Sequence, residues 1–163
     1  MGEKDLGRVP QTISDAIEVC RRLKMRYLWV DALCIIQDDE KDKDSQLPEM
    51  DKIYSVAALT IVAACGTDAK SGLSCLRYRC SPQSSARIHG ITYVTGDIPL
   101  DERIQKTTWN TRGWTYQECI LSRRLLVFTD SQVFFICAGG TRAEDTNYLE
   151  SKRIVSACGA CPI

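Results

Sequence analysis

A stretch at residues 112–118, of sequence RGWTYQE, contains the residue types best suited to chemistry. Trp114 and Glu118 stand four residues apart, so on a helix the indole and the carboxylate lie side by side on one face. Arg112 comes just ahead of the first turn of this predicted helix. Such a cluster is either the floor of a binding site or a structural anchor in which Glu118 pairs with Arg112 or Arg123.

A second candidate carboxylate interrupts an apolar run. Residues 27–36, of sequence YLWVDALCII, follow a predicted helix and indicate a strand buried on both faces, as in a parallel sheet. Asp31 stands within this run, where a carboxylate is costly unless it is paired or lies at the end of the strand. Ligands bind at the carboxyl ends of strands in open α/β sheets. Asp31 is therefore either a ligand-binding group or a structural group that caps a turn or pairs with an arginine.

Cysteine is the next residue type that could do chemistry, and the chain has nine of them. Because the N-terminal residues contain no apolar signal segment, we expect reduced thiols in the cytosol or nucleus. Cys75 and Cys80 have four residues between them, and Cys158 and Cys161 form a CxxC pair near the C-terminus. Four cysteines could hold zinc and two could form an active dithiol, but the loose spacing and the terminal position disfavour both. The sequence therefore predicts no metal site.

The elements that position these residues alternate between helices and strands in the first half of the chain. We expect two helices, at residues 10–25 and 47–57. We expect two buried strands, at residues 27–36 and 59–65. Helix, strand, helix and strand with short connections are typical of βαβ units in a parallel sheet.

The second half of the chain is irregular at first and then indicates a hairpin. Residues 88–94 and 98–100 indicate either short strands or an excursion on the surface. The helix that carries Glu118 runs to about residue 121. Two apolar runs within 124–137 are separated by turn residues, which predicts a β-hairpin. The predicted fold class is α/β, with mainly parallel strands flanked by helices and a C-terminal β-hairpin.

Composition limits the classes of partner. At 163 residues the chain is expected to form one domain, and its 21 basic and 21 acidic residues cancel. No overall charge therefore attracts nucleic acid or an anionic membrane surface. No apolar run approaches the roughly 20 residues that span a bilayer. We expect a cytoplasmic protein whose partners do not include nucleic acid and which has no membrane span.

Several blocks of this sequence together resemble a known family. They are YLWVDALCIIQDD, MDKIYSVAALTIVAA and RGWTYQECILSRRLLVF, with PQTISDAIEVCRRL just before them. They are similar to the heterokaryon-incompatibility (HET) domain of filamentous fungi. The resemblance implies tails at residues 1–9 and 146–163 and a HET domain at 10–145, with an irregular insertion at about 66–111. It also implies a cytoplasmic cell-death effector of non-self recognition, with other cell-death or recognition proteins as partners.

The HET domain is in turn similar to Toll/interleukin-1 receptor (TIR) domains, which have a flavodoxin-like parallel sheet. Trp114 and Glu118 match the Trp-x-x-x-Glu motif of TIR enzymes, whose glutamate serves in cleaving the nicotinamide–ribose bond of NAD. The resemblance implies Glu118 as the catalytic residue and NAD as a substrate rather than a cofactor. It implies Arg112, Trp114 and Asp31 as substrate-binding residues. Loss of nicotinamide leaves an oxocarbenium-like ribosyl cation, which a nearby carboxylate stabilises.

One departure from the family pattern concerns the start of the domain. HET domains usually open with a strand and a Leu-Ser-Tyr-x-Trp-Gly motif ahead of the first helix, and this sequence has no counterpart of either. We therefore expect a partial HET domain. The missing strand would lie near the centre of a flavodoxin-like sheet, so its neighbour would keep an open edge that invites self-association. The alternative to an NAD-cleaving enzyme is a non-enzymatic interaction module that nucleates a signalling assembly.

Overall fold

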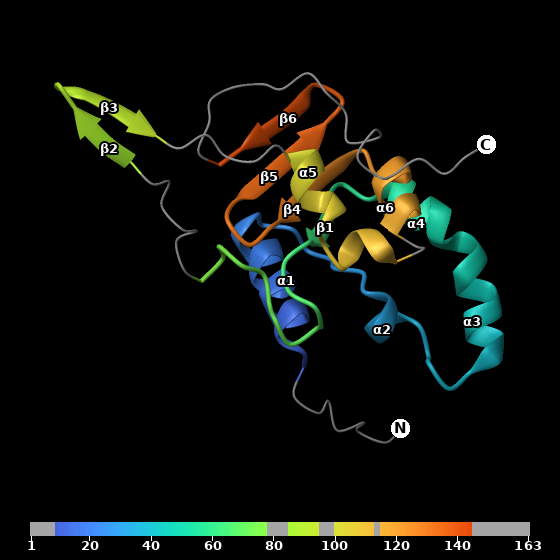
Figure 1. Cartoon of the computed structure of the whole chain (residues 1–163). Helices are drawn as coiled ribbons and strands as arrows, with labels where there is room; N and C mark the ends of the chain where they lie inside the picture. Colours follow the sequence, from blue (N-terminus) through green and yellow to red (C-terminus); the bar gives the residue numbers. More distant parts are fainter. Residues whose placement is uncertain (1–8, 78–84, 95–99, 113–114, 145–163) are drawn as a thin grey trace.

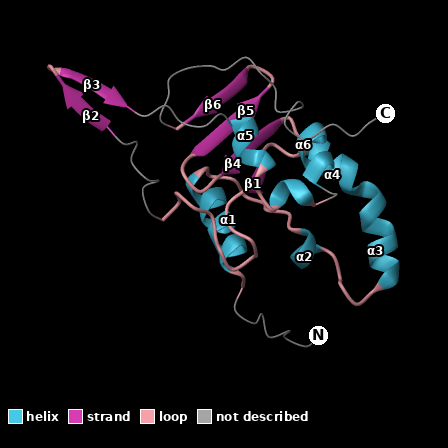
Figure 2. Ribbon diagram, in the orientation of Figure 1, coloured by secondary structure: helices cyan, strands magenta, loops and turns pink. Residues whose placement is uncertain are grey.

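The computed structural model describes residues 9–77, 85–94, 100–112 and 115–144 of the chain. Within these residues the protein is α/β: helices flank a four-stranded mixed sheet, and a separate two-stranded hairpin projects from it (Figures 1 and 2). The helical elements are α1 (Gln11–Arg22), α2 (Asp31–Cys34), α3 (Glu40–Gln46), η1 (Leu47–Glu49), α4 (Met50–Val56), α5 (Leu100–Gln105), η2 (Trp109–Thr111) and α6 (Thr115–Leu121). The strands are β1 (Thr60–Ala63), β2 (Ser85–Ile88), β3 (Ile91–Val94), β4 (Arg124–Phe128), β5 (Val133–Cys137) and β6 (Gly140–Ala143).

The four-stranded sheet has the order β1-β4-β5-β6. Strands β1 and β4 run parallel, with Thr60 opposite Leu125, whereas the β4–β5 and β5–β6 pairs are antiparallel. The prediction of mainly parallel strands is therefore wrong. Residues 129–132 join β4 to β5 in a tight turn, in which the Thr129 hydroxyl donates to the carbonyl oxygen of Gln132 at 2.7 Å. A connection this short can join only antiparallel neighbours, and the predicted C-terminal hairpin is confirmed.

The buried strand predicted at residues 27–36 is wrong. The regular structure in this run is the short helix α2, and none of the described strands pairs with it. The Asp31 carboxylate accepts a hydrogen bond from the N–H of Ala32 at 2.7 Å, and the Gln37 amide donates to the carbonyl oxygens of Asp31 and Ile35. These local hydrogen bonds compete with a strand ladder for the same backbone groups. The run is consequently exposed in part, and Tyr27 is 83% exposed.

Most other elements follow the sequence pattern. The helices predicted at residues 10–25 and 47–57 are confirmed as α1 and as η1 with α4. The strand predicted at 59–65 is confirmed as β1. The helix that carries Glu118 ends at Leu121, as the sequence predicts. Helical spacing of apolar residues was therefore a sufficient signal for α1 and α4, and a continuous apolar run was a sufficient signal for β1.

The middle and the end of the chain needed more than apolar spacing. The short strand considered at 88–94 is instead the two-strand hairpin of β2 and β3. Of the short strand considered at 98–100, Leu100 is the described residue, and it begins α5. Strand β6 was not predicted, because Gly139 and Gly140 indicated only a break in the chain. Strand β6 forms because it pairs with β5, and its own residues show no strand pattern.

Strand β4 forms the centre of the core because its side chains alternate between the two faces of the sheet. Leu125 and Val127 pack into one cluster, which also contains Trp109 from η2. Phe128 packs into a second cluster with Val19 from α1. Helix α1 therefore covers one face of the sheet, and α5, η2 and α6 contribute to the other (Figure 1).

A buried carboxylate joins α1 to the loop that follows β1. Asp15 is 2% exposed, and its oxygens accept hydrogen bonds from Gln11, Arg77 and the N–H of Leu73 at between 2.7 and 2.9 Å. Gly72 comes so close that an added Cβ would lie 2.6 Å from a carboxylate oxygen, and its φ of +77° also favours glycine. Asp15 therefore fixes this loop against α1.

Replacing Asp15 by alanine should lower the free energy of unfolding by about 2–3 kcal/mol, because the buried N–H of Leu73 would lose its acceptor. Glu18→Ala is a matched control on the same helix. The ion pair of Glu18 with Arg22 is exposed and should contribute at most about 1 kcal/mol. Urea unfolding followed by circular dichroism measures both variants. Equal losses in the two would contradict the role given to Asp15.

Candidate functional site

The parallel pairing of β1 and β4 places the two preceding helices side by side. Helix α4 leads into β1, helix α6 leads into β4, and the two helices are in contact (Figure 1). Tyr54 lies six residues before the first residue of β1, and Glu118 lies six residues before the first residue of β4. The hydroxyl oxygens of Thr60 and Ser122 are 2.7 Å apart and join the two segments near the start of the strands. Tyr54 and Glu118 thus occupy equivalent positions on neighbouring helices.

The half-buried carboxylate of Glu118 accepts hydrogen bonds from two aromatic side chains. The Trp109 indole donates from Nε1 to Oε2 at 3.0 Å, and the Tyr54 hydroxyl donates to Oε1 at 3.4 Å. Within the described part of the chain no basic side chain pairs with Glu118. The structural alternative, an ion pair with Arg112 or Arg123, is therefore not formed among these residues.

Three charged residues act on the Tyr54 hydroxyl. The pKa of its phenol is raised well above the usual value of about 10, chiefly by burial, then by the negative charge of Glu118 and next by that of Asp31. The positive charge of Arg112 acts in the opposite direction. Three of the residues singled out in the sequence thus lie within electrostatic reach of one hydroxyl.

Asp31 begins α2 and does not end a strand, which corrects the position predicted for it. It is exposed, and its carboxylate accepts the N–H of the next residue, so it does start a helical turn. Its charge also acts on Tyr54. Two residues earlier, Trp29 meets the Tyr54 ring edge-on, with centroids 6.3 Å apart and an interplanar angle of 77°. The aromatic contact explains how this segment comes close to α4.

Arg112 is exposed and begins the turn into α6. Its carbonyl oxygen accepts hydrogen bonds from the hydroxyl of Thr115 at 2.5 Å and from the N–H of the same residue at 3.2 Å. Among the described residues its guanidinium forms no ion pair, so the charge is available to a ligand. Trp114 lies outside the described residues. The charges of Glu118, Asp31 and Arg112 therefore all act on one residue, Tyr54.

Two residues of this cluster, Tyr54 and Trp109, were not predicted from the sequence. Tyr54 has helical spacing with Met50 and Ile53, which indicates only an apolar face of the helix predicted at residues 47–57. A signal was nevertheless present, because a buried tyrosine hydroxyl or tryptophan N–H usually finds a hydrogen-bond partner. Glu118 is the acceptor that satisfies both.

The arrangement gives Glu118 a defined chemical capacity. An indole N–H and a protonated phenol are neutral donors, so neither cancels a negative charge on the carboxylate. Such a carboxylate can stabilise a developing positive charge or accept hydrogen bonds from ligand hydroxyls. Asp31 and Arg112 add one charge of each sign nearby.

Metal and thiol chemistry gain no support from the residues that are described. These residues contain no group of three or more His, Cys, Asp or Glu side chains placed to hold a metal ion. Cys75 is disulfide-bonded, so the expectation of reduced thiols is wrong for this residue. Cys80, Cys158 and Cys161 lie outside the described residues.

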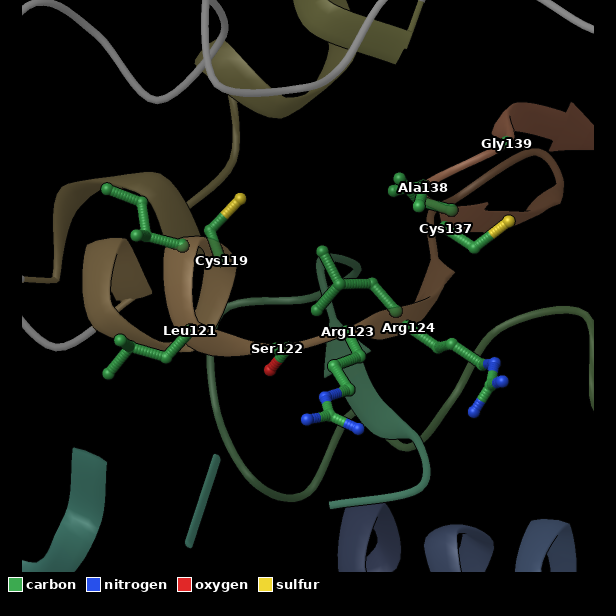
Figure 3. A pocket seen from close by; sticks show the side chains of 11 residues that line it. Cys119, Leu121, Ser122, Arg123, Arg124, Cys137, Ala138 and Gly139 are labelled. Carbon is green, nitrogen blue, oxygen red and sulfur yellow. The ribbon is translucent and has the colours of Figure 1, made fainter. Parts of the chain in front are cut away.

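A groove of about 540 Å³ begins at the residue that follows Glu118. Its lining comes from the end of α6, the start of β4 and the β5–β6 turn (Figure 3). In this view the Cys119 thiol points upward from α6, and the side chains of Arg123 and Arg124 extend downward and to the lower right from the start of β4. The groove includes none of the predicted site residues. It is therefore a feature of α6 separate from the carboxylate cluster.

Comparison with known proteins gives one match. A family model described as "Heterokaryon incompatibility protein (HET)" matches residues 2–118, which is 117 of the 163 residues. The matched range contains every residue of the cluster around Tyr54. No curated protein and no solved structure matches the chain. Among the residues that the structure describes, every helix is too short or too polar to pass through a lipid bilayer.

The raised pKa of Tyr54 predicts a pH dependence of stability. Because the protonated phenol is favoured in the folded protein, its contribution is complete below about pH 10 and is lost as the pH rises toward the folded pKa. Tyr54→Phe cannot ionise, so its free energy of unfolding should fall less steeply than that of wild type between about pH 9.5 and 11.5. Urea unfolding at several pH values in this range measures the free energy of unfolding of each protein and tests the prediction. Tyr27→Phe is the matched control at an exposed tyrosine, and equal slopes for the two variants would refute the prediction.

Proposed function

This chain belongs to the heterokaryon incompatibility (HET) family, and from this we propose that it is a cell-death effector in fungal non-self recognition that acts by cleaving NAD. One observation carries the proposal. The Glu118 carboxylate is held by two neutral donors and, in the described part of the chain, by no basic partner. Arg112 and Asp31 place charges of both signs nearby. This combination suits the stabilisation of a ribosyl cation.

In the proposed reaction the bond between the nicotinamide nitrogen and ribose C1′ breaks, and its electron pair leaves with nicotinamide. The ribose then carries an oxocarbenium-like charge, which the Glu118 carboxylate stabilises. Water attacks C1′ and loses a proton, so the products are ADP-ribose, nicotinamide and a proton. Asp31 accepts a hydrogen bond from a ribose hydroxyl, Arg112 binds a phosphate in bidentate fashion, and Trp114 orients Glu118 or excludes water.

We further propose a TIR-like arrangement for the domain at residues 10–145 and a cytoplasmic site of action. The arrangement is supported by the two helix–strand units α4–β1 and α6–β4, whose strands pair in parallel. Helix α1 on the opposite face of the sheet also supports it. Strands β5 and β6 depart from such an arrangement, because they continue the sheet in antiparallel pairs. The proposed likeness is therefore limited to the part of the domain that carries Glu118.

Glu118→Gln should abolish NAD consumption by the purified full-length chain, lowering the rate at least about 100-fold, because an amide offers no negative charge to the cation. Chromatography of the released nicotinamide and ADP-ribose measures the rate. Glu102→Gln, at an exposed glutamate on α5, is the matched control and should keep the wild-type rate. Circular dichroism checks that both variants fold. Wild-type turnover in Glu118→Gln would rule out the assignment.

A non-enzymatic interaction module is the second candidate, and an exposed apolar face favours it. Directly opposed residues of the β2–β3 hairpin share a face, which places Ala86, Ile88, Ile91 and Tyr93 together. The last three are more than half exposed. A two-stranded hairpin is marginally stable alone in water, so such a face suits contact with a partner protein. Strand β1 adds an open edge for self-association, since among the described strands it pairs with β4 alone.

The variant Ile91→Asp separates the two candidates. If the protein acts as an interaction module, a charge on this apolar face should abolish killing in fungal cells, while NAD levels stay constant in cells that express the wild type. Thr92→Asp is the matched control, because Thr92 lies on the opposite face of the hairpin. Killing that survives Ile91→Asp but disappears with Glu118→Gln would favour the enzyme instead.

A further inference from the structure

The two donors to Glu118 differ in how firmly they are held. Trp109 is 7% exposed and belongs to the core cluster that also contains Ile104 and Leu125. Its indole can only donate, and it does so to Oε2 at 3.0 Å. A side chain packed in a dense core has little freedom to move. Trp109 therefore ties one oxygen of the carboxylate to the core.

Tyr54 holds the other oxygen less firmly. Its hydroxyl donates to Oε1 at 3.4 Å, which is long for an O–H···O hydrogen bond. Its ring is half-buried and is fixed from one side by the edge contact with Trp29. The hydroxyl can rotate about its bond to the ring, whereas the indole N–H cannot rotate. Oε1 is therefore the oxygen that can exchange its partner for a ligand hydroxyl.

We infer that Trp109 and Tyr54 are positioning residues for Glu118: Trp109 fixes Oε2, and Tyr54 holds Oε1 in place until the substrate takes it over. This inference rests on the proposed NAD cleavage. The ribose contact is assigned to Oε1, and the plane of the carboxylate is set by the indole. The assignment matters because a misplacement of about 1 Å in a reacting group can lower a rate by about 100-fold.

Kinetics of the full-length chain with NAD provide the first test. Trp109→Phe should lower kcat by about 10-fold to 100-fold with little change in KM, because binding groups remain while the carboxylate loses its anchor. Tyr54→Phe should lower kcat less than Trp109→Phe does. Ile104→Val is the matched control, since it removes one methyl group from the same core cluster and no hydrogen bond. A kcat for Trp109→Phe equal to that of Ile104→Val would overturn the inference.

Nuclear magnetic resonance provides a test that does not need turnover. The indole N–H of Trp109, identified by its loss in Trp109→Phe, should show a downfield chemical shift because it donates to the Glu118 carboxylate. Among the described residues, the charges of Asp31 and Arg112 also act on Tyr54. Asp31→Asn should therefore preserve the shift, and Glu118→Gln should remove it.

The two experiments separate failure of the inference from failure of the proposed function. If wild type leaves NAD intact and the Trp109 indole shift still depends on Glu118, the anchoring of the carboxylate stands and NAD cleavage falls. If NAD is cleaved and the indole shift persists in Glu118→Gln, cleavage stands and the positioning role falls. Loss of kcat in Trp109→Phe together with loss of the shift in Glu118→Gln supports both.

Discussion

The parallel register between β1 and β4, in which Thr60 lies opposite Leu125, is the constraint on which the rest of the structure depends. It aligns the two helices that lead into these strands and so brings the Tyr54 hydroxyl to Glu118. It also directs Leu125 and Val127 toward the cluster that contains Trp109. A slip of one residue would turn every side chain of β4 to the opposite face. The core and the carboxylate cluster would then be lost together, because both are built on this one pairing.

Sequence spacing alone could associate only those residues of the candidate site that are neighbours in the chain. Arg112 and Glu118 belong to one predicted helix and its approach, so helical spacing alone associates them. Tyr54 contacts Glu118 across 64 positions of the chain, and this contact exists only once β1 and β4 have paired. Trp109 is close to Glu118 in sequence, yet it lies on η2 whereas Glu118 lies on α6, so the spacing within one helix does not associate them. The family resemblance, and not spacing, indicated Asp31 as a substrate-binding residue; it was expected in a strand, whereas it begins the helix α2.

The fold could be predicted where one signal dominates. Apolar spacing gave α1 and α4, and turn residues between two apolar runs gave the β4–β5 hairpin. The strand prediction for residues 27–36 was wrong because continuous apolar character does not distinguish a strand from other apolar segments. There the hydrogen bonds of Asp31 and Gln37 decide the backbone conformation. The prediction of mainly parallel strands was wrong for a different reason. The short connections after β4 make the following strands antiparallel, and an apolar run does not indicate the direction in which a strand pairs.

The buried Asp15 network also affects how this domain can diverge. Arg77 is fastened to α1 by that carboxylate, and Leu100 is buried in the core at the start of α5. The β2–β3 hairpin lies between these two fixed points. The entropic cost of closing a connection grows by only about 0.6 kcal/mol for each doubling of its length. The hairpin can therefore gain or lose residues, or be exchanged, without disturbing the four-stranded sheet. The β2–β3 hairpin and the cluster around Glu118 can consequently evolve at independent rates.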